Sequence, residues 1–297
     1  MLAQNRYCRA MTQDVAASWN DHAELYARMF APLTSYIARA MLQTVDARLP
    51  PAARMLDIAC GSGALALPAV QRAQRELAMT GKAGEIVASD FSSAMVALTQ
   101  QAGAALGAPP AMLQCDVQNG EALTYADASF DAVFSSFGIF LFADRMAGWR
   151  EAARVLRPSG LFVTAVWQGP ATNPMMRAQM APVMAAMPKH LMPTSSKGSW
   201  IEIATAEALI AEVTSAAPLV NPQVYPFTAT FALSDGRLIW DAMQNNPVMG
   251  AMLRRCNPEE LAVVRTSVMN YFRELAGGDG LPIMLDAVCN ILVAQRG

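Results

Sequence analysis

The sequence predicts an α/β protein in which a mostly parallel, doubly wound sheet carries helices on both faces. Two observations predict this class. Between residues 54 and 167, apolar runs of strand length alternate with helical patterns, which is typical of a parallel sheet. The first run, 54–58, leads through the small-residue turn 60–63 directly into a helical pattern. A strand joined to a helix by a glycine loop is typical of ligand-binding folds of this class.

Each expected element in this region has a local signal. The expected strands are 54–58, 85–90, 111–115, 131–136 and 161–167. The expected helices are 63–79, 92–106 and 144–156. Pro68 falls near the first turn of the first helix, where a missing N–H is least costly. Ser92 or Ser93 is a suitable N-cap for the second, and Pro158 and Gly160 are expected to stop the third.

Segments on either side of this alternating region are expected to form additions to the sheet. Helical spacing predicts a cover of two helices, at 12–31 and 32–46. After residue 168 the expected elements are a methionine-rich segment at 173–193, a helix at 205–216, an extended segment at 222–233, a long helical stretch at 235–276 and a last strand at 288–295.

These segments define the expected organisation of a single α/β domain. An N-terminal helical cover occupies residues 1–50 and the ligand-binding core occupies 51–168. Residues 169–287 are expected to be substrate-cover insertions, and 288–297 the last strand of the core sheet.

Composition excludes several classes of function. Apolar residues make up 54% of the chain and charged residues 15%, below the roughly 25% that is usual. With a net charge of −2 and no basic run, we expect no nucleic-acid partner. The longest apolar stretch, 132–143, is shorter than the roughly 20 residues that span a bilayer. We therefore expect a soluble protein with no integral membrane segment.

Cysteine and histidine usage indicates an intracellular protein without a metal centre. The five cysteines are scattered without C-x-x-C spacing, and two histidines are too few for a metal cluster. A cytoplasmic location is the first expectation. A mitochondrial one is the alternative, because no acid precedes Asp14 and the segment carries Arg6 and Arg9.

Three acidic residues follow three consecutive expected strands. They are Asp57, Asp90 and Asp116. Ligands of open α/β sheets bind outside the carboxyl ends of the strands, so the three carboxylates should line one crevice about the size of a nucleoside. Asp57 would repel a pyrophosphate, but it suits a ligand that carries an ammonium and a carboxylate. The helix that follows offers its N-terminus to an anionic group.

A nicotinamide or flavin site is the main alternative for the glycine loop. Gly61-x-Gly63-x-x-Ala66 fits the dinucleotide pattern G-x-G-x-x-G/A, and Asp90 lies close to the expected distance for a ribose-binding acid. The acids at positions 57 and 116 instead favour a nucleoside ligand that carries an ammonium and a carboxylate.

The sequence resembles the class I S-adenosylmethionine-dependent methyltransferases, especially the small-molecule branch with ubiquinone/menaquinone-type and sterol methyltransferases. Asp57-Ile-Ala-Cys-Gly-Ser-Gly63 looks like the family's first motif, D/E-x-G-x-G-x-G, with Ala59 in place of the first glycine. The resemblance covers about 54–167, including the segments 127–133 and 151–160, and does not extend to 168–287. It implies a seven-stranded Rossmann-like sheet in which the last strand is antiparallel and inserted near one edge.

The resemblance implies S-adenosyl-L-methionine as cofactor and a role for each matching residue. Asp57 would accept a hydrogen bond from the α-ammonium group of the cofactor, directly or through water. Asp90 would accept from the two ribose hydroxyls. The backbone at Ala59, Gly61 and Gly63 would approach the methionine part.

The other implied contacts surround the adenine and the sulfonium. Phe91 would pack against adenine, and Asp116 would accept from the adenine amino group with Val117 beside the ring. Ser135 or Ser136 would lie near the sulfonium and the path of methyl transfer.

Three residues outside the motifs are further candidates. Tyr26, in the N-terminal cover, would hydrogen-bond the cofactor carboxylate. His22 and His190 are candidate catalytic bases for an oxygen acceptor, although ordinary packed or solvated histidines would give the same pattern.

The expected function is methyl transfer to a small, largely apolar molecule at oxygen or carbon. A non-catalytic protein that binds S-adenosylmethionine or S-adenosylhomocysteine is the alternative, and a nicotinamide-dependent oxidoreductase a more distant one. The methionines between 173 and 193 either fill a core or line a lid over an apolar acceptor; they are residues 175, 176, 180, 184, 187 and 192.

Overall fold

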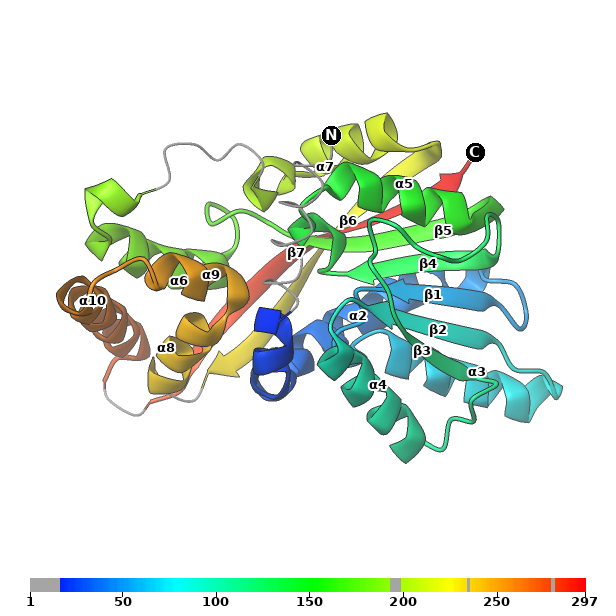
Figure 1. The fold of residues 1–297 in the computed structure, drawn as a ribbon, viewed down its shortest axis with the longest axis horizontal. Coiled ribbons are helices and arrows are strands. Elements are labelled where there is room, and N and C mark those ends of the chain that lie inside the picture. The colour runs from blue at the N-terminus through cyan, green and yellow to red at the C-terminus, as the bar shows by residue number, and fades with distance from the viewer. Residues whose placement is uncertain (1–16, 193–198, 234–235, 279–280) are drawn as a thin grey trace. The chain divides into compact units, whose positions relative to one another are not determined.

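The structure is a computed structural model that describes residues 17–192, 199–233, 236–278 and 281–297. These residues form two compact units. The first unit contains the described residues up to Val166, together with Ala206–Tyr225 and Asn290–Gly297. The second contains the described residues of Trp167–Thr205 and Pro226–Cys289. Figure 1 shows the elements of both units.

A seven-stranded sheet has the strand order β3-β2-β1-β4-β5-β7-β6. The five strands from β3 to β5 pair in parallel. β7 lies between β5 and β6 and runs in the opposite direction to both (Figure 1). This confirms the mostly parallel sheet with one inserted antiparallel strand. The strands are β1 (Arg54–Ile58), β2 (Glu85–Asp90), β3 (Leu113–Val117), β4 (Phe130–Ser136), β5 (Leu156–Trp167), β6 (Leu219–Leu233) and β7 (Ile283–Arg296).

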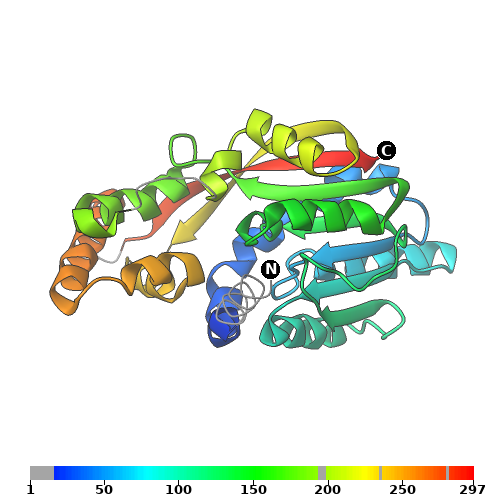
Figure 2. The same cartoon turned by 45° about the horizontal axis from the view of Figure 1, so that its top comes forward.

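Helices of the first unit cover both faces of its sheet. One face carries α2 (Ala31–Val45), α3 (Ala66–Thr80) and α4 (Ser93–Ala105), which contact one another in sequence order. The other carries α5 (Arg145–Val155) and α7 (Ala206–Ala216), which pack together (Figures 1 and 2). A further helical segment, residues 17–29, precedes α2.

Side-chain caps explain where two of these helices begin. The Ser92 hydroxyl accepts a hydrogen bond from the Met95 N–H at 3.2 Å, as the sequence predicts for the N-cap of α4. The Asp144 carboxylate accepts from the Ala147 N–H at 2.9 Å and caps α5. A partly buried hydrogen bond joins α5 to α7, because Glu212 accepts from the Trp149 indole N–H at 2.9 Å.

The second unit contains four α-helices among its described residues and a core of its own. They are α6 (Pro174–Ala186), α8 (Gly236–Asn245), α9 (Pro247–Leu253) and α10 (Pro258–Ala276). Val183, Met187, Trp240, Val268 and Phe272 belong to one apolar cluster in this unit. Short 3-10 helices occur at Asp46–Arg48, Ile139–Leu141, Lys189–Leu191 and Trp200–Ile203.

Four expected boundaries were wrong. β7 begins at Ile283, five residues before the strand expected at 288–295. The single long helix expected at 235–276 is divided into α8, α9 and α10, because Pro247 and Asn257 begin new helices. β5 begins at Leu156, directly after α5, so Pro158 and Gly160 lie within a strand that is irregularly paired there. β3 lies two residues later than expected, because the Met112 N–H closes a turn on the Pro109 carbonyl.

Only part of the expected N-terminal cover lies among the described residues. The helix expected at 12–31 is described from residue 17 and is helical to residue 29. The segment on which the alternative localisation depends lies outside the described residues. Within the described part of the chain, no helix combines the length and apolar character needed to cross a membrane.

Candidate functional site

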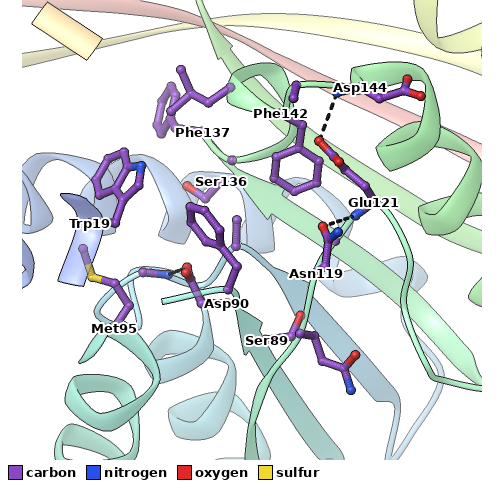
Figure 3. Close-up of a pocket in the computed structure, with 18 of the residues that line it drawn as sticks. Trp19, Ser89, Asp90, Met95, Asn119, Glu121, Ser136, Phe137, Phe142 and Asp144 are labelled. Carbon is purple, nitrogen blue, oxygen red and sulfur yellow. Dashed lines mark hydrogen bonds between the residues drawn. The ribbon is translucent and has the colours of Figure 1, made fainter. Parts of the chain in front are cut away.

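A cavity of about 340 Å³ lies in the first unit beside the glycine loop that follows β1. Its volume falls within the range of small-molecule sites. Side chains from five segments meet there (Figure 3). The lining residues are Trp19, Tyr26, Ala59, Gly61, Ser89, Asp90, Phe91, Met95, Gln118, Asn119, Gly120, Glu121, Ser136, Phe137, Gly138, Leu141, Phe142, Ala143 and Asp144.

The glycine loop needs two of its glycines for different reasons. Gly61 has φ +54°, and its N–H donates to Asp90 Oδ2 at 3.0 Å. Its carbonyl accepts from the Thr99 hydroxyl at 2.8 Å. Gly63 has φ +93°, and a Cβ there would come within 2.9 Å of the Leu67 side chain. Gly61 lines the cavity and Gly63 does not, so Gly63 contributes to the conformation of the loop and not to the cavity wall.

Ala59 occupies the position where the resemblance expects a glycine, and it keeps a glycine-like conformation. Its φ is +57°, in the left-handed region that L-residues seldom adopt. Its methyl group takes space that would otherwise be open beside Gly138, since a Cβ on Gly138 would lie 2.5 Å from the Ala59 Cβ. Both residues line the cavity.

Asp90 presents a fixed carboxylate to the cavity at the end of β2. Its side chain is only 5% exposed, and each oxygen accepts one backbone N–H, from Gly61 at 3.0 Å and from Ser92 at 2.9 Å. Burial raises the pKa of Asp90 to about 6, and the backbone hydrogen bonds limit that rise. The group is therefore ionised at neutral pH and retains lone pairs for a ligand.

Asp57 lies deeper than Asp90 and does not line the cavity. Its Oδ2 accepts from the Ala66 N–H at 3.1 Å, at the start of α3. Its Oδ1 is buried and has no hydrogen-bond partner among the described residues. Burial is the main cause of the rise in the pKa of Asp57 to about 8, and the nearby Asp90 charge contributes to the rise. A buried acceptor without a donor is the feature that a ligand ammonium or a bridging water would satisfy.

Asp116 and Val117 also lie outside the cavity lining. The Asp116 carboxylate accepts from the Gln114 amide at 2.9 Å and from the Tyr125 hydroxyl at 2.8 Å. Val117 is 57% exposed. The four residues that follow, 118–121, line the cavity instead.

The two serines at the end of β4 differ in their partners. Ser135 accepts from the Ile139 N–H at 3.2 Å and does not line the cavity. Ser136 lines it, and its buried hydroxyl has no partner among the described residues. The next residue, Phe137, has φ +59° and also faces the cavity, which is an unusual conformation for a bulky residue.

Residues 17–29 contribute two aromatic side chains to the cavity. Trp19 and Tyr26 both line it, and their rings meet edge to face at 5.6 Å. Burial raises the pKa of Tyr26, so its hydroxyl remains protonated. Sequence reasoning identified Tyr26 but missed Trp19. The signal was present, since residues seven apart lie on one face of a helix.

Neither candidate histidine lines the cavity. His22 Nδ1 lies 2.6 Å from the Ser18 carbonyl of its own helix. His190 belongs to the second unit, and its Nε2 lies 3.7 Å from a Glu260 oxygen. No cluster of metal-ligating side chains occurs among the residues that the structure describes.

The charged residues of the cavity lining are all acidic. They are Asp90, Glu121 and Asp144, and the lining contains no Lys or Arg among the described residues. Such a site attracts a cationic ligand and repels a pyrophosphate.

Comparison with known proteins gives a consistent result for the core. Residues 56–164 match the family model described as "Methyltransferase domain". An uncharacterized Mycobacterium tuberculosis protein is 29% identical over 184 residues, which is 61% of this chain and 60% of that protein. Demethylmenaquinone methyltransferase of Deinococcus radiodurans is 38% identical over 120 residues, or 40% of this chain and 45% of that enzyme. The chain thus spans less than two thirds of the length of these relatives.

A solved structure shares the fold. The YcgJ protein of Bacillus subtilis superposes with a TM-score of 0.54 at 17% identity, covering 88% of this chain and 98% of that one. At this identity the likeness concerns the fold alone.

Proposed function

Residues 56–164 form a class I S-adenosylmethionine-dependent methyltransferase domain, and we propose that the protein transfers the cofactor's methyl group to a small, largely apolar molecule at oxygen or carbon. This chain resembles an enzyme named demethylmenaquinone methyltransferase, and that name supports the proposal. So does the apolar part of the cavity, which Trp19, Phe137, Leu141 and Phe142 line. An oily acceptor would replace water against these surfaces.

The charge of the cavity is the observation that carries the proposal. S-adenosylmethionine brings a sulfonium and an ammonium, and the lining offers the carboxylates of Asp90 and Glu121 with no basic side chain among the described residues. The third acid of the lining, Asp144, uses its carboxylate to cap α5 and lies 3.7 Å from an Arg150 nitrogen. A nicotinamide dinucleotide would instead bring a pyrophosphate to the glycine loop, where the ionised Asp90 carboxylate accepts from the Gly61 N–H. The acidic lining therefore favours the sulfonium nucleoside.

Six residues of the site have a proposed task toward the bound cofactor. Asp90 accepts from the ribose hydroxyls, because its oxygens are held in place by two backbone N–H groups. The orphaned Asp57 oxygen accepts from the ammonium, directly or through water. The backbone of Ala59 and Gly61 approaches the methionine part, with Gly63 shaping the loop. The protonated Tyr26 hydroxyl donates to the carboxylate.

The cofactor supplies an electrophilic methyl group, and the protein supplies position. An in-line displacement gains most of its acceleration when nucleophile and methyl are held together in a dry site. The unpartnered Ser136 hydroxyl, on the cavity wall at the end of β4, would hydrogen-bond an acceptor oxygen and orient it.

Calorimetric titration with S-adenosylmethionine and S-adenosylhomocysteine tests the shared binding step. We expect binding by the native protein and a loss of about 100-fold in affinity for Asp90→Asn, because its amide cannot accept from both ribose hydroxyls and the ionic acceptor is gone. The matched control is Asp241→Asn, an exposed position on α8 in the second unit, which should bind normally. No binding by the native chain would refute the cofactor assignment.

Incubation with isotopically labelled cofactor and a metabolite extract separates an enzyme from a binding protein. We expect labelled methylated products in mass spectra, with none in the Asp90→Asn variant. Tight cofactor binding without any labelled product across broad extracts would favour the non-catalytic binding protein.

A further inference from the structure

Residues 17–29 (the cover helix) form one wall of the cavity. Trp19 and Tyr26 of this helix line the cavity. The Tyr26 ring lies beside the glycine loop, since a Cβ on Gly61 would be 3.9 Å from Tyr26 Cε1. Figure 3 shows Trp19 and Met95, a residue of α4, on the same side of the cavity. The cavity is therefore complete only while the cover helix lies against the rest of the first unit.

The side chain next to Trp19 joins the cover helix to α4. Asn20 Oδ1 accepts from the Ser92 hydroxyl at 2.7 Å and from the Ala94 N–H at 3.1 Å, across 72 and 74 residues of sequence. An N–H group can only donate, so the atom that faces Ala94 must be an acceptor, and the Asn20 carbonyl supplies it. Among the described residues, no other side chain of the cover helix makes a hydrogen bond to α4 or to the glycine loop.

Asn20 completes the capping of α4. The first N–H groups of an α-helix have no partner within the helix. The Ser92 hydroxyl accepts from the Met95 N–H at 3.2 Å, and Asn20 accepts from the Ala94 N–H. The single hydroxyl proton of Ser92 goes to Asn20. Because Ser92 is fully buried, water can replace Asn20 there only if the cover helix moves away.

Ser92 also links the cover helix to the carboxylate that is proposed to bind the ribose. Its backbone N–H donates to Asp90 Oδ1 at 2.9 Å, while its hydroxyl donates to Asn20 at 2.7 Å. One buried residue thus holds the carboxylate with its main chain and the cover helix with its side chain. The positions of Trp19 and Tyr26 relative to Asp90 therefore depend on two hydrogen bonds that meet at Ser92.

We propose that Asn20 is a positioning residue that holds the cover helix on α4, so that Trp19 and Tyr26 close the cavity over a bound ligand. Asn20 itself does not line the cavity, so it acts through these two aromatic residues. The effect on cofactor binding rests on the proposed function, whereas the docking of the helix is measurable without a ligand. Loosening a wall of the cavity should act mainly on the rate at which the ligand leaves.

Fluorine NMR of protein labelled with 5-fluorotryptophan tests the docking directly. The chain has five tryptophans, and the resonance that is lost in Trp19→Phe belongs to Trp19. In ligand-free Asn20→Ala, this resonance should move toward its position in the unfolded protein. The remaining resonances should keep their native positions, which shows that the variant is folded. Glu24→Ala, at an exposed position of the same helix, is the matched control and should leave all resonances in place.

Binding of S-adenosylhomocysteine measures the consequence for the site. Asn20→Ala should bind this ligand about tenfold more weakly, mainly through faster dissociation in stopped-flow displacement, because the two hydrogen bonds are lost. Glu24→Ala should keep the native affinity to within about twofold.

Two results would overturn the role of Asn20. One is a Trp19 resonance that stays at its native position in Asn20→Ala, and the other is a native affinity and dissociation rate although that resonance has moved. If the native protein does not bind S-adenosylhomocysteine while the Trp19 resonance moves in Asn20→Ala, the proposed function is refuted and the docking by Asn20 is supported.

Discussion

The two compact units differ in what they bury. In the first unit, buried polar side chains gather around the glycine loop and the ends of β2 and β4; they include Asp57, Ser89, Asp90, Ser92, Thr99 and Ser135. In the second unit, Asn173 is the one polar residue that is buried as a whole among the described residues, and the Ser199 hydroxyl is a buried atom of a partly exposed residue. Asn173 accepts from the Met176 N–H at 3.3 Å and donates to the Val288 carbonyl at 2.8 Å, so its polar atoms serve the fold.

This difference separates binding from packing. Asp57 Oδ1, next to the glycine loop, and Ser136 Oγ, on the cavity wall, are buried without partners among the described residues, and a ligand would satisfy them. The other two unpartnered oxygens, of Ser62 in the first unit and Ser199 in the second, belong to residues outside the cavity lining. The methionines of the second unit illustrate the other case. Met175 and Met187 are buried, and Met187 belongs to the apolar cluster against which Met192 packs. They fill a core, as one of the two sequence interpretations states, while a lid function stays a prediction.

Truncation of Phe272 should have the largest effect and should leave the cavity intact. This residue is 1% exposed in the apolar cluster of the second unit. Phe272→Ala should lower the free energy of unfolding by about 3–5 kcal/mol, because it removes buried apolar surface and leaves a void in the core of the second unit. Denaturant unfolding measures the change.

The Phe272→Ala variant should also keep its ligand affinity. The affinity of the folded variant for S-adenosylhomocysteine should change by less than about twofold, because every residue that lines the cavity belongs to the first unit. Val263→Ala, at a 59% exposed position on α10, is the control and should be nearly neutral in both measurements. A tenfold loss of affinity would show that the separation is false.

The pH dependence of cofactor binding should report the buried acids of the first unit. Raised pKa values of about 8 for Asp57 and about 6 for Asp90 mean that both gain protons as the pH falls from 8.5 to 5.5. Ribose hydroxyls and an ammonium prefer the ionised forms, so affinity should weaken by up to about 100-fold across this range. Asp57→Asn should remove the upper part of the profile. A flat native profile would contradict the proposed roles.

The same pKa shifts predict the opposite pH dependence for the stability of the empty protein. A carboxyl with a raised pKa binds more protons in the folded state than in the unfolded state, so stability should fall as the pH rises from about 4 to about 8. Chemical unfolding at several pH values measures this trend. It should be weaker in Asp57→Asn.

Overpacking at Gly138 should have a smaller effect that is confined to the first unit. A Cβ there would lie 2.5 Å from the Ala59 Cβ and 2.8 Å from Ser135 Oγ. Gly138→Ala should lower stability by about 1–3 kcal/mol and weaken cofactor binding by roughly tenfold, and adding Ala59→Gly should restore part of both. Gly169→Ala in the second unit is the control, because its nearest contact would be an ordinary 3.7 Å. Equal effects at both glycines would contradict the argument.

Ala59→Gly alone should have the smallest effect. Relief of the left-handed backbone strain favours the variant, and the greater freedom of glycine in the unfolded chain opposes it. The net expectation is a gain of about 0.5 kcal/mol, measured by thermal unfolding. A clear destabilisation would show that the packing of the Ala59 methyl against Gly138 stabilises the fold by more than the left-handed backbone conformation of Ala59 destabilises it.

Local signals in the sequence located many of the elements. β1 and β2 have the expected bounds, and α4 begins after the expected cap at Ser92, because strand hydrophobicity and helix caps act between near neighbours. The same reasoning placed the end of α5 to within one residue but misplaced the next strand, because β5 begins at Leu156 and not at 161. Pro158 and Gly160 are typical of a helix stop, yet Ser159 adopts φ +63° and the chain enters β5 at once. Pairing with β4 decides that outcome, and pairing is not a local property.

The sequence by itself determined the class of fold, the glycine loop and the acid at the end of β2, because these depend on the periodicity and spacing of neighbouring residues. Only the tertiary structure decided which side chains reach the cavity. Asp116 lies next to β2 but outside the cavity lining, whereas Glu121 and Trp19 arrive from segments about 100 residues apart. Contacts between distant residues depend on how helices and loops pack, so no spacing rule along the chain reveals them.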